Sequence, residues 1–150
     1  MSGWSGIMIV GAGLLSLLWS AVFVPTSRSA EKESPGECPS SPNCVSSRSA
    51  DPRHAIDPLH YDIPADQALE CLKQILVSMK RTRIVSEGYE MLRVEFRSLL
   101  GFADDGKFHL DGSNGVIHMR SASRVGYWDL GVNRRRLEEI RARFTKLCVR

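Results

Sequence analysis

The segment Arg120–Arg134 (RSASRVGYWDLGVNR) combines residue types that bind anionic or polar ligands. Arg120 and Arg124 can form forked hydrogen bonds to carboxylate or phosphate groups. The segment has neither a helical nor a strand period, and long connections of this kind often carry function. We therefore predict a ligand-binding loop with the following side chains: Arg120, Ser121, Ser123, Arg124, Tyr127, Asp129, Asn133 and Arg134.

An internal alternative stays open for the same segment. Asp129 would pair with Arg120 or Arg124 and pin the loop to the domain, while Tyr127 and Trp128 pack over the core.

The helix expected after this loop bears on the ligand-binding interpretation. The free N–H groups at its start favour anions. The three arginines from 134 to 136 oppose the dipole of that helix at its start, which indicates partners outside the domain and favours a ligand.

Two further function classes compete with ligand binding. A hydrolase would use the hydroxyl of Ser121 or Ser123 with His118 as its base, but the chain has no Gly-x-Ser-x-Gly nucleophile elbow. A purely structural interaction domain is the other alternative. The sequence favours a binding role over an enzymatic one, and no cofactor is expected.

Cysteines at positions 38 and 44 enclose a short loop in CPSSPNC. Five intervening residues, two of them proline, can curl into a ring, so a Cys38–Cys44 disulfide is the favoured interpretation. Pairing with Cys71 or Cys148 and free thiols remain as alternatives, because four cysteines allow three complete connectivities. Oxidation would require export from the cytoplasm.

A zinc site formed by Cys38, Cys44, His54 and His60 is another interpretation of this region. Structural zinc sites usually space their cysteines by two to four residues and place the histidine pair on a helix. Prolines on both sides of His54 break any helix there. We therefore expect no metal site.

The N-terminal residues 1–30 contain an uncharged apolar run, Ile7–Val24, of 18 residues. As a helix it would span about 27 Å, close to the bilayer core of about 30 Å. We expect a single-pass membrane anchor; a cleaved signal peptide, giving a secreted protein, is the alternative. The charge of Arg28 favours a cytoplasmic position for that end, but the cysteines favour an extracytoplasmic, periplasmic domain.

Residues 31–55 are rich in serine, proline and charge and are expected to form a tether, followed by a compact domain at 56–150. Periodic apolar positions predict two helices, and alternation with turn signals such as DGSNG predicts antiparallel strands between them. This pattern indicates an α+β fold, a small antiparallel sheet covered by two helices and preceded by the N-terminal hydrophobic helix. The predicted elements are helices at 66–80 and 134–147, and strands at 83–85, 90–97, 107–110 and 116–120.

Two residues of these elements receive a structural role. Cys71 lies at the edge of the apolar stripe of the first helix and is interpreted as a small core residue. Asn133 is placed as the N-cap of the last helix.

The overall net charge of +3 hides an uneven distribution. Residues 134–150 hold seven basic and two acidic side chains, a balance of +5 (7 − 2). Acidic residues interrupt this helix and no aromatic stacking platform accompanies it, so nucleic acid is excluded as a partner. The expected partners are the membrane through the N-terminal segment and, at the loop, an anionic ligand, a lipid head group or a protein.

Three stretches, CPSSPNCVSS, RSASRVG and DLGVNRRRLE, together resemble the bacterial and plastid family called Domain of Unknown Function 1499. GFADD at residues 101–105 is similar to the same family's pattern. The resemblance covers roughly residues 37 to 147. It implies a small protein with an N-terminal export or membrane segment and no agreed activity, and it carries over no catalytic residues.

Overall fold

The computed structural model describes residues 36–149, which form one antiparallel sheet and two helices. Its strand order is β1-β6-β5-β4-β3, and β2 also pairs with β6. The predicted α+β fold is confirmed for this part of the chain. The elements are β1 (Cys44–Ser46), β2 (Leu59–His60), α1 (Ala65–Ser78), β3 (Thr82–Glu87), β4 (Met91–Arg97), β5 (Ala103–Asp111), β6 (Val116–Ser123) and α2 (Val132–Cys148).

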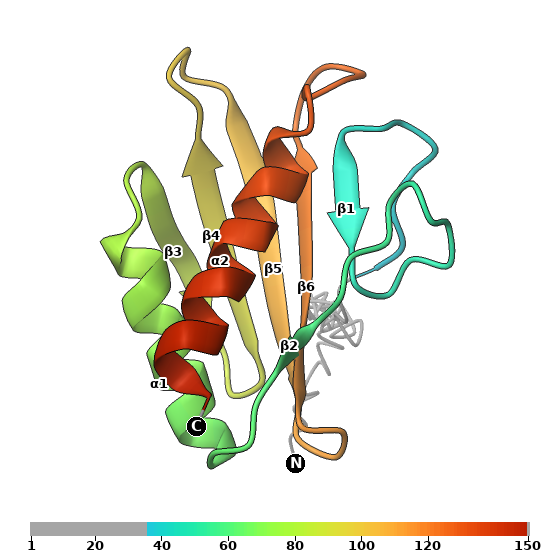
Figure 1. The fold of residues 1–150 in the computed structure, drawn as a ribbon. Coiled ribbons are helices and arrows are strands. Elements are labelled where there is room, and N and C mark those ends of the chain that lie inside the picture. The colour runs from blue at the N-terminus through green and yellow to red at the C-terminus, as the bar shows by residue number, and fades with distance from the viewer. Residues whose placement is uncertain (1–35, 150) are drawn as a thin grey trace, which may run out of the picture. The chain divides into compact units, whose positions relative to one another are not determined.

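Both helices lie on one face of the sheet (Figure 1). On β4 the alternation of the sequence puts Leu92, Val94 and Phe96 against the helices, where all three are buried. The apolar stripes of α1 and α2 close the core from the other side. The buried helix residues are Ala68, Leu69, Leu72, Ile75, Leu76, Leu137, Ile140 and Phe144.

The hydrophobic run Ile7–Val24 lies outside the described residues, so the predicted N-terminal helix has no structural description. Within residues 36–149, neither helix has the length and apolar character needed to cross a bilayer.

The tether predicted for residues 31–55 is wrong over its described part. Residues 44–46 form β1, which pairs with the end of β6. The side chains of Val45 and Ser46 are buried there, and His54 Nδ1 lies 2.8 Å from the carbonyl oxygen of Cys44. A strand of three residues is too short to show a period, which is why this serine- and proline-rich sequence resembled a linker.

Two other predictions are corrected. Cys71 is not a simple core residue, because it forms a disulfide with Cys148 and links α1 to α2 with a Cα–Cα distance of 6.1 Å. Asn133 is not the N-cap of α2, because the helix begins at Val132, after Gly131 at the N-cap position. The carboxylate of Asp129 accepts hydrogen bonds from the N–H groups of Gly131 and Asn133 and so takes over the capping role.

Candidate functional site

The predicted loop and the β4–β5 connection lie at the same end of the sheet. The register pairs Arg97 with Ala103 and Asp104 with Ser123, so β4 and β6 end on either side of the start of β5. The Arg124 N–H donates to the Ala103 carbonyl at 3.2 Å and holds the two connections together. Both rise above the sheet at the top of Figure 1.

At the base of this end, Asn133 joins three segments. Its Nδ2 donates to the carbonyl of Asn43 at 3.1 Å and to the hydroxyl of Ser123 at 3.0 Å. Its Oδ1 accepts from the hydroxyl of Ser121. Asn133 and Ser121 are fully buried, so their hydrogen bonds replace the water they lose. The structure thus brings Ser121, Ser123 and Asn133 together, but as a fixed polar core below the loop.

Arg136 extends this network, and its role could not be read from the sequence. Its guanidinium pairs with Asp104 at 2.8 Å, donates to Asn133 Oδ1 at 3.0 Å, and lies over the Phe96 ring at 4.5 Å from the centroid. Arg136 and Asp104 are 12% and 8% exposed, so this ion pair is buried. One of the three arginines that needed partners at the helix start therefore has them inside the domain.

The other predicted cations are also held by the protein. Arg124 pairs with Asp105 at 2.7 Å and with Glu95 at 3.0 Å, and the hydrogen bonds that it donates to Asp105 raise the pKa of its guanidinium. Arg134 donates to the backbone carbonyls of Ala55 and Arg53. The alternative in which Asp129 pairs with Arg120 or Arg124 is wrong, because the Asp129 carboxylate caps α2 instead.

Arg120 differs from the other arginines. It alternates with Ser121 along β6, so it lies on the sheet face opposite the helices. Its Nε is buried without a hydrogen-bond partner among the described residues, and burial lowers the pKa of its guanidinium. Arg120 and Arg124 therefore do not converge with Ser121 on one ligand.

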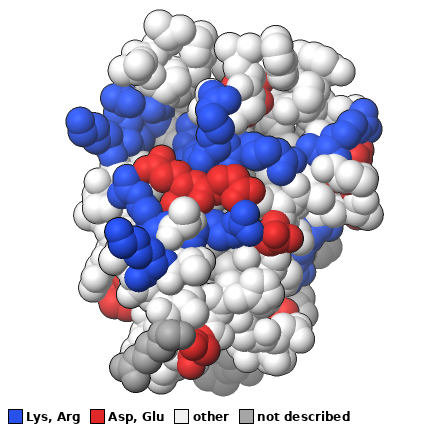
Figure 2. Space-filling view, in the orientation of Figure 1, with Lys and Arg blue, Asp and Glu red and all other residues white. Residues whose placement is uncertain are grey.

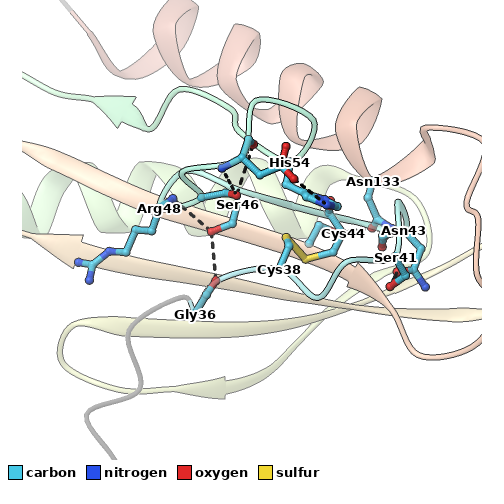
Figure 3. The surroundings of a disulfide bond; sticks show 12 residues. Gly36, Cys38, Ser41, Asn43, Cys44, Ser46, Arg48, His54 and Asn133 are labelled. Atoms are coloured by element: carbon cyan, nitrogen blue, oxygen red, sulfur yellow. Dashed lines mark hydrogen bonds and ion pairs between the residues drawn. A yellow bond between two sulfur atoms is a disulfide. The ribbon is translucent and has the colours of Figure 1, made fainter.

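The Cys38–Cys44 disulfide is confirmed, with a Cα–Cα distance of 5.6 Å. Figure 3 shows it beside β1, where the Ser46 hydroxyl donates to the Gly36 carbonyl at 3.2 Å. With both sulfurs in this bond, the zinc alternative through Cys38 and Cys44 is wrong. The disulfide closes the edge of the sheet next to the Asn133 network.

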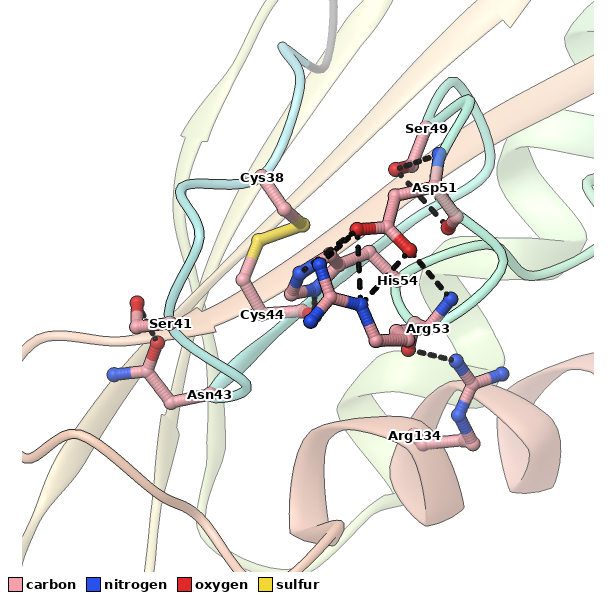
Figure 4. A network of polar contacts seen from close by, with 9 residues as sticks. All are labelled: Cys38, Ser41, Asn43, Cys44, Ser49, Asp51, Arg53, His54 and Arg134. Carbon is pink, nitrogen blue, oxygen red and sulfur yellow. Dashed lines mark hydrogen bonds and ion pairs between the residues drawn. A yellow bond between two sulfur atoms is a disulfide. The ribbon is translucent and has the colours of Figure 1, made fainter.

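Figure 4 shows a polar turn next to this disulfide. The Asp51 carboxylate accepts from the Arg53 guanidinium at 2.6 Å and from its backbone N–H at 2.9 Å. These bonds lower the pKa of Asp51 to about 2. Arg134 reaches the Arg53 carbonyl from α2, so the turn is fastened to the helix.

The predicted Ser–His pair is wrong. The hydroxyls of Ser121 and Ser123 bond to Asn133 on the helix face, whereas His118 lies on the opposite face of β6. His118 Nδ1 instead lies 3.2 Å from the hydroxyl of Ser47, and its Nε2 lies 3.6 Å from the carboxylate of Asp111. Burial and the charge of Arg48 lower the pKa of His118 and favour its neutral form.

What the loop presents to solvent is apolar. Tyr127 and Trp128 are exposed, and so are apolar side chains of the neighbouring β4–β5 connection, where Leu99 and Leu100 are each 84% exposed. The expectation that the two aromatic residues pack over the core is wrong. We call these seven residues the apolar tip: Leu99, Leu100, Phe102, Val125, Tyr127, Trp128 and Leu130.

Only Tyr127 of the apolar tip was among the predicted site residues. Val125, Trp128 and Leu130 lie within the predicted loop but were not chosen. The signal for Leu99, Leu100 and Phe102 was an apolar run between two strands that has no helical or strand period. An exposed apolar cluster on a small domain usually marks an interaction surface.

Basic side chains lie at the same end of the domain as the apolar tip. Figure 2 shows a band of Lys and Arg crossing the upper part of the helix face, below two uncharged lobes, with acidic residues in the middle of the face. Among the described residues, Lys80, Arg81, Arg134 and Arg135 lie near the tip and have no carboxylate partner. The end therefore combines exposed apolar groups with four unneutralised positive charges.

Comparison with known proteins points to one family. A family model described as "Protein of unknown function (DUF1499)" matches residues 36–144, well over half of the chain, and confirms the resemblance of the three sequence stretches. No curated protein and no solved structure matches the chain.

Proposed function

This chain belongs to the DUF1499 family, and we propose that it is a membrane-associated accessory protein whose domain rests on an anionic bilayer by its apolar tip. The observation that carries the proposal is the tip itself, two adjacent connections with seven exposed apolar side chains. Tyrosine and tryptophan suit the membrane–water interface because their rings are apolar and their edges polar.

The charges favour a bilayer over another protein as the occupant of the tip. Each unneutralised Lys or Arg near an anionic surface contributes about 1 kcal/mol of attraction. Lys80, Arg81, Arg134 and Arg135 lie behind the tip, where head groups would be met as the loops enter the interface. Binding then grows with buried apolar area and with the share of anionic lipid.

Two features of the chain support a location at the membrane and outside the cytoplasm. The run Ile7–Val24 is long enough to anchor the chain in a membrane by one pass. Both disulfides, Cys38–Cys44 and Cys71–Cys148, suit an oxidising compartment, so the domain is proposed to lie outside the cytoplasm.

The test uses the full-length chain with Trp4 and Trp19 changed to Phe, which leaves Trp128 as the sole tryptophan. The protein is reconstituted in vesicles of phosphatidylcholine, with or without phosphatidylglycerol. We expect Trp128 emission to shift to the blue and to be quenched by brominated lipid when the anionic lipid is present. Equal, water-like emission in both vesicles would overturn the proposal.

Matched double variants make the test specific. Phe102→Ser with Val125→Ser removes one apolar side chain from each connection and should abolish the shift. Val85→Ser with Leu147→Ser removes two exposed apolar side chains from other surfaces and should leave it unchanged. A shift that survives the first pair would show that the tip does not make the contact.

A hydrolase is the second candidate, now with Ser47 as its nucleophile. It is supported by the chain Ser47–His118–Asp111 and by a cavity of about 430 Å³ that Asp111 lines. However, the Ser47 hydroxyl already accepts from the Met119 N–H at 2.9 Å, as a structural serine does. A fluorophosphonate probe that labels the protein but not Ser47→Ala would support this candidate; no labelling, or labelling unchanged in that variant, would dismiss it.

A further inference from the structure

A cavity of about 650 Å³ opens beside the apolar tip. It lies between the end of α1, the start of β3, the end of β4 and the first turns of α2. Its volume falls within the range of about 300–1,000 Å³ that is usual for small-molecule sites. The proposed membrane contact does not account for this space.

One part of the cavity wall is basic. Five of its lining residues carry positive charge and only Glu139 carries negative charge, and Glu139 is already bonded to Arg143. Among the described residues, the side chains of Lys80 and Arg81 make no hydrogen bond and no ion pair. Arg135 uses one nitrogen to donate to the Leu130 carbonyl at 2.8 Å. The remaining N–H groups of these three side chains are available for an anion.

The other two cations of the wall are committed elsewhere. Arg136 is held by Asp104 at 2.8 Å, and Arg97 by Glu95 at 2.8 Å. Their guanidinium groups are therefore already matched by carboxylates of the protein. The anion would therefore be bound mainly by Lys80, Arg81 and Arg135.

Another part of the wall is apolar. Leu99 and Leu100 border the cavity and are strongly exposed, and Val132 lines it from α2. A small inorganic anion would leave these side chains in water. An anion that carries an alkyl chain would bind the basic and the apolar wall at once.

We propose that this cavity binds the charged end of a single-chain amphiphilic anion, a phosphate or carboxylate group attached to an alkyl or acyl chain. The anionic group lies against Lys80, Arg81 and Arg135, and the first carbons of the chain lie against Leu99 and Leu100. The inference goes beyond membrane docking, because a free amphiphile needs no bilayer to reach the cavity.

Calorimetric titration of the full-length chain in neutral phosphatidylcholine nanodiscs tests this inference, with empty discs as the blank. The probes are hexyl phosphate, inorganic phosphate and hexanol. Hexyl phosphate should bind at least tenfold more tightly than inorganic phosphate, and hexanol should not bind. Equal affinities for hexyl phosphate and inorganic phosphate would reduce the cavity to a simple anion site and overturn the proposal, as would an absence of binding.

Variants locate the binding. Lys80→Gln with Arg81→Asn should weaken hexyl phosphate binding at least tenfold; asparagine suits position 81, where φ is +58°. Lys146→Gln, the same change at an exposed lysine of the last helical turn, should have no effect. If the double variant does not fold, Lys80→Gln alone decides. Binding that persists in the folded variant would contradict the proposal.

The two proposals fail separately. Phe102→Ser with Val125→Ser should abolish docking of the tip but leave hexyl phosphate binding intact, because neither residue lines the cavity. If the chain without these substitutions binds hexyl phosphate but does not dock, only the cavity proposal stands, and if it docks but does not bind hexyl phosphate, only the tip proposal stands.

Discussion

Removing the charge of Arg136 should destabilise the domain strongly. Arg136→Met leaves the carboxylate of Asp104 buried without its partner, since Asp104 is 8% exposed. Breaking a buried ion pair in this way costs about 3–5 kcal/mol. The free energy of unfolding in urea should fall by that amount.

The matched control is Arg143→Met on the same helix. Arg143 is 43% exposed and pairs with Glu139 at the surface, so its loss should cost about 0–1 kcal/mol. If both substitutions lower the free energy of unfolding by the same amount, the Arg136–Asp104 pair stabilises the domain no more than a surface ion pair does, which would contradict the prediction.

Asp51 provides a pH-dependent prediction. Its pKa of about 2, against an ordinary 3.8, means that the folded state favours the ionised carboxylate. The stability it contributes is therefore present above pH 3.8 and is lost as the pH falls towards 2. An NMR titration should give a midpoint near 2, and Arg53→Ala should raise it towards 3.8. A midpoint unchanged by Arg53→Ala would contradict the assigned cause.

For single residues, the sequence predicted which polar side chains lie together better than it predicted what they bind. Ser121, Ser123 and Asn133 do lie together, but they satisfy one another. Their spacing showed polar groups on adjacent elements and could not show whether a ligand or a neighbour fills their hydrogen bonds. Asn43, which bonds to Asn133, and Asp104, which holds Arg136, complete that network from distant parts of the chain, which no local pattern reveals.

Among the elements, the two disulfides should stabilise the domain unequally. Cys71–Cys148 links the helices across 77 residues, whereas Cys38–Cys44 spans 6. Loop-closure entropy gives about 4.5 kcal/mol for the first and about 2 kcal/mol for the second. Replacing each pair by alanine and measuring urea unfolding should show the larger loss for the helix pair, and a larger loss for the short loop would contradict the prediction.

The elements were predictable where a period extends over several turns or residues. The stripe of α1 and the alternation of β4 are examples, and both appear within two residues of their expected bounds. β1 and β2 were missed because three and two residues carry no period. The start of α2 shifted because the carboxylate of Asp129 caps it in place of Asn133.

For the whole molecule, both proposals concern one end of the domain. The apolar tip, the basic side chains and the cavity all lie where β4 and β6 end and α2 begins. The DGSNG turn lies at the other end of β5 and β6, since Asp111 pairs with Val116 and Asp104 with Ser123. Contact with a bilayer should therefore protect backbone amides at this end of the domain and not at the end that carries the DGSNG turn.

Amide hydrogen exchange of the full-length chain in vesicles tests most directly whether the apolar tip contacts the bilayer. We predict that adding phosphatidylglycerol to phosphatidylcholine vesicles slows exchange in residues 98–102 and 124–131 and leaves residues 111–115 unchanged. Unchanged exchange in the first two segments, or equal slowing in all three, would contradict the account that the apolar tip rests on the membrane.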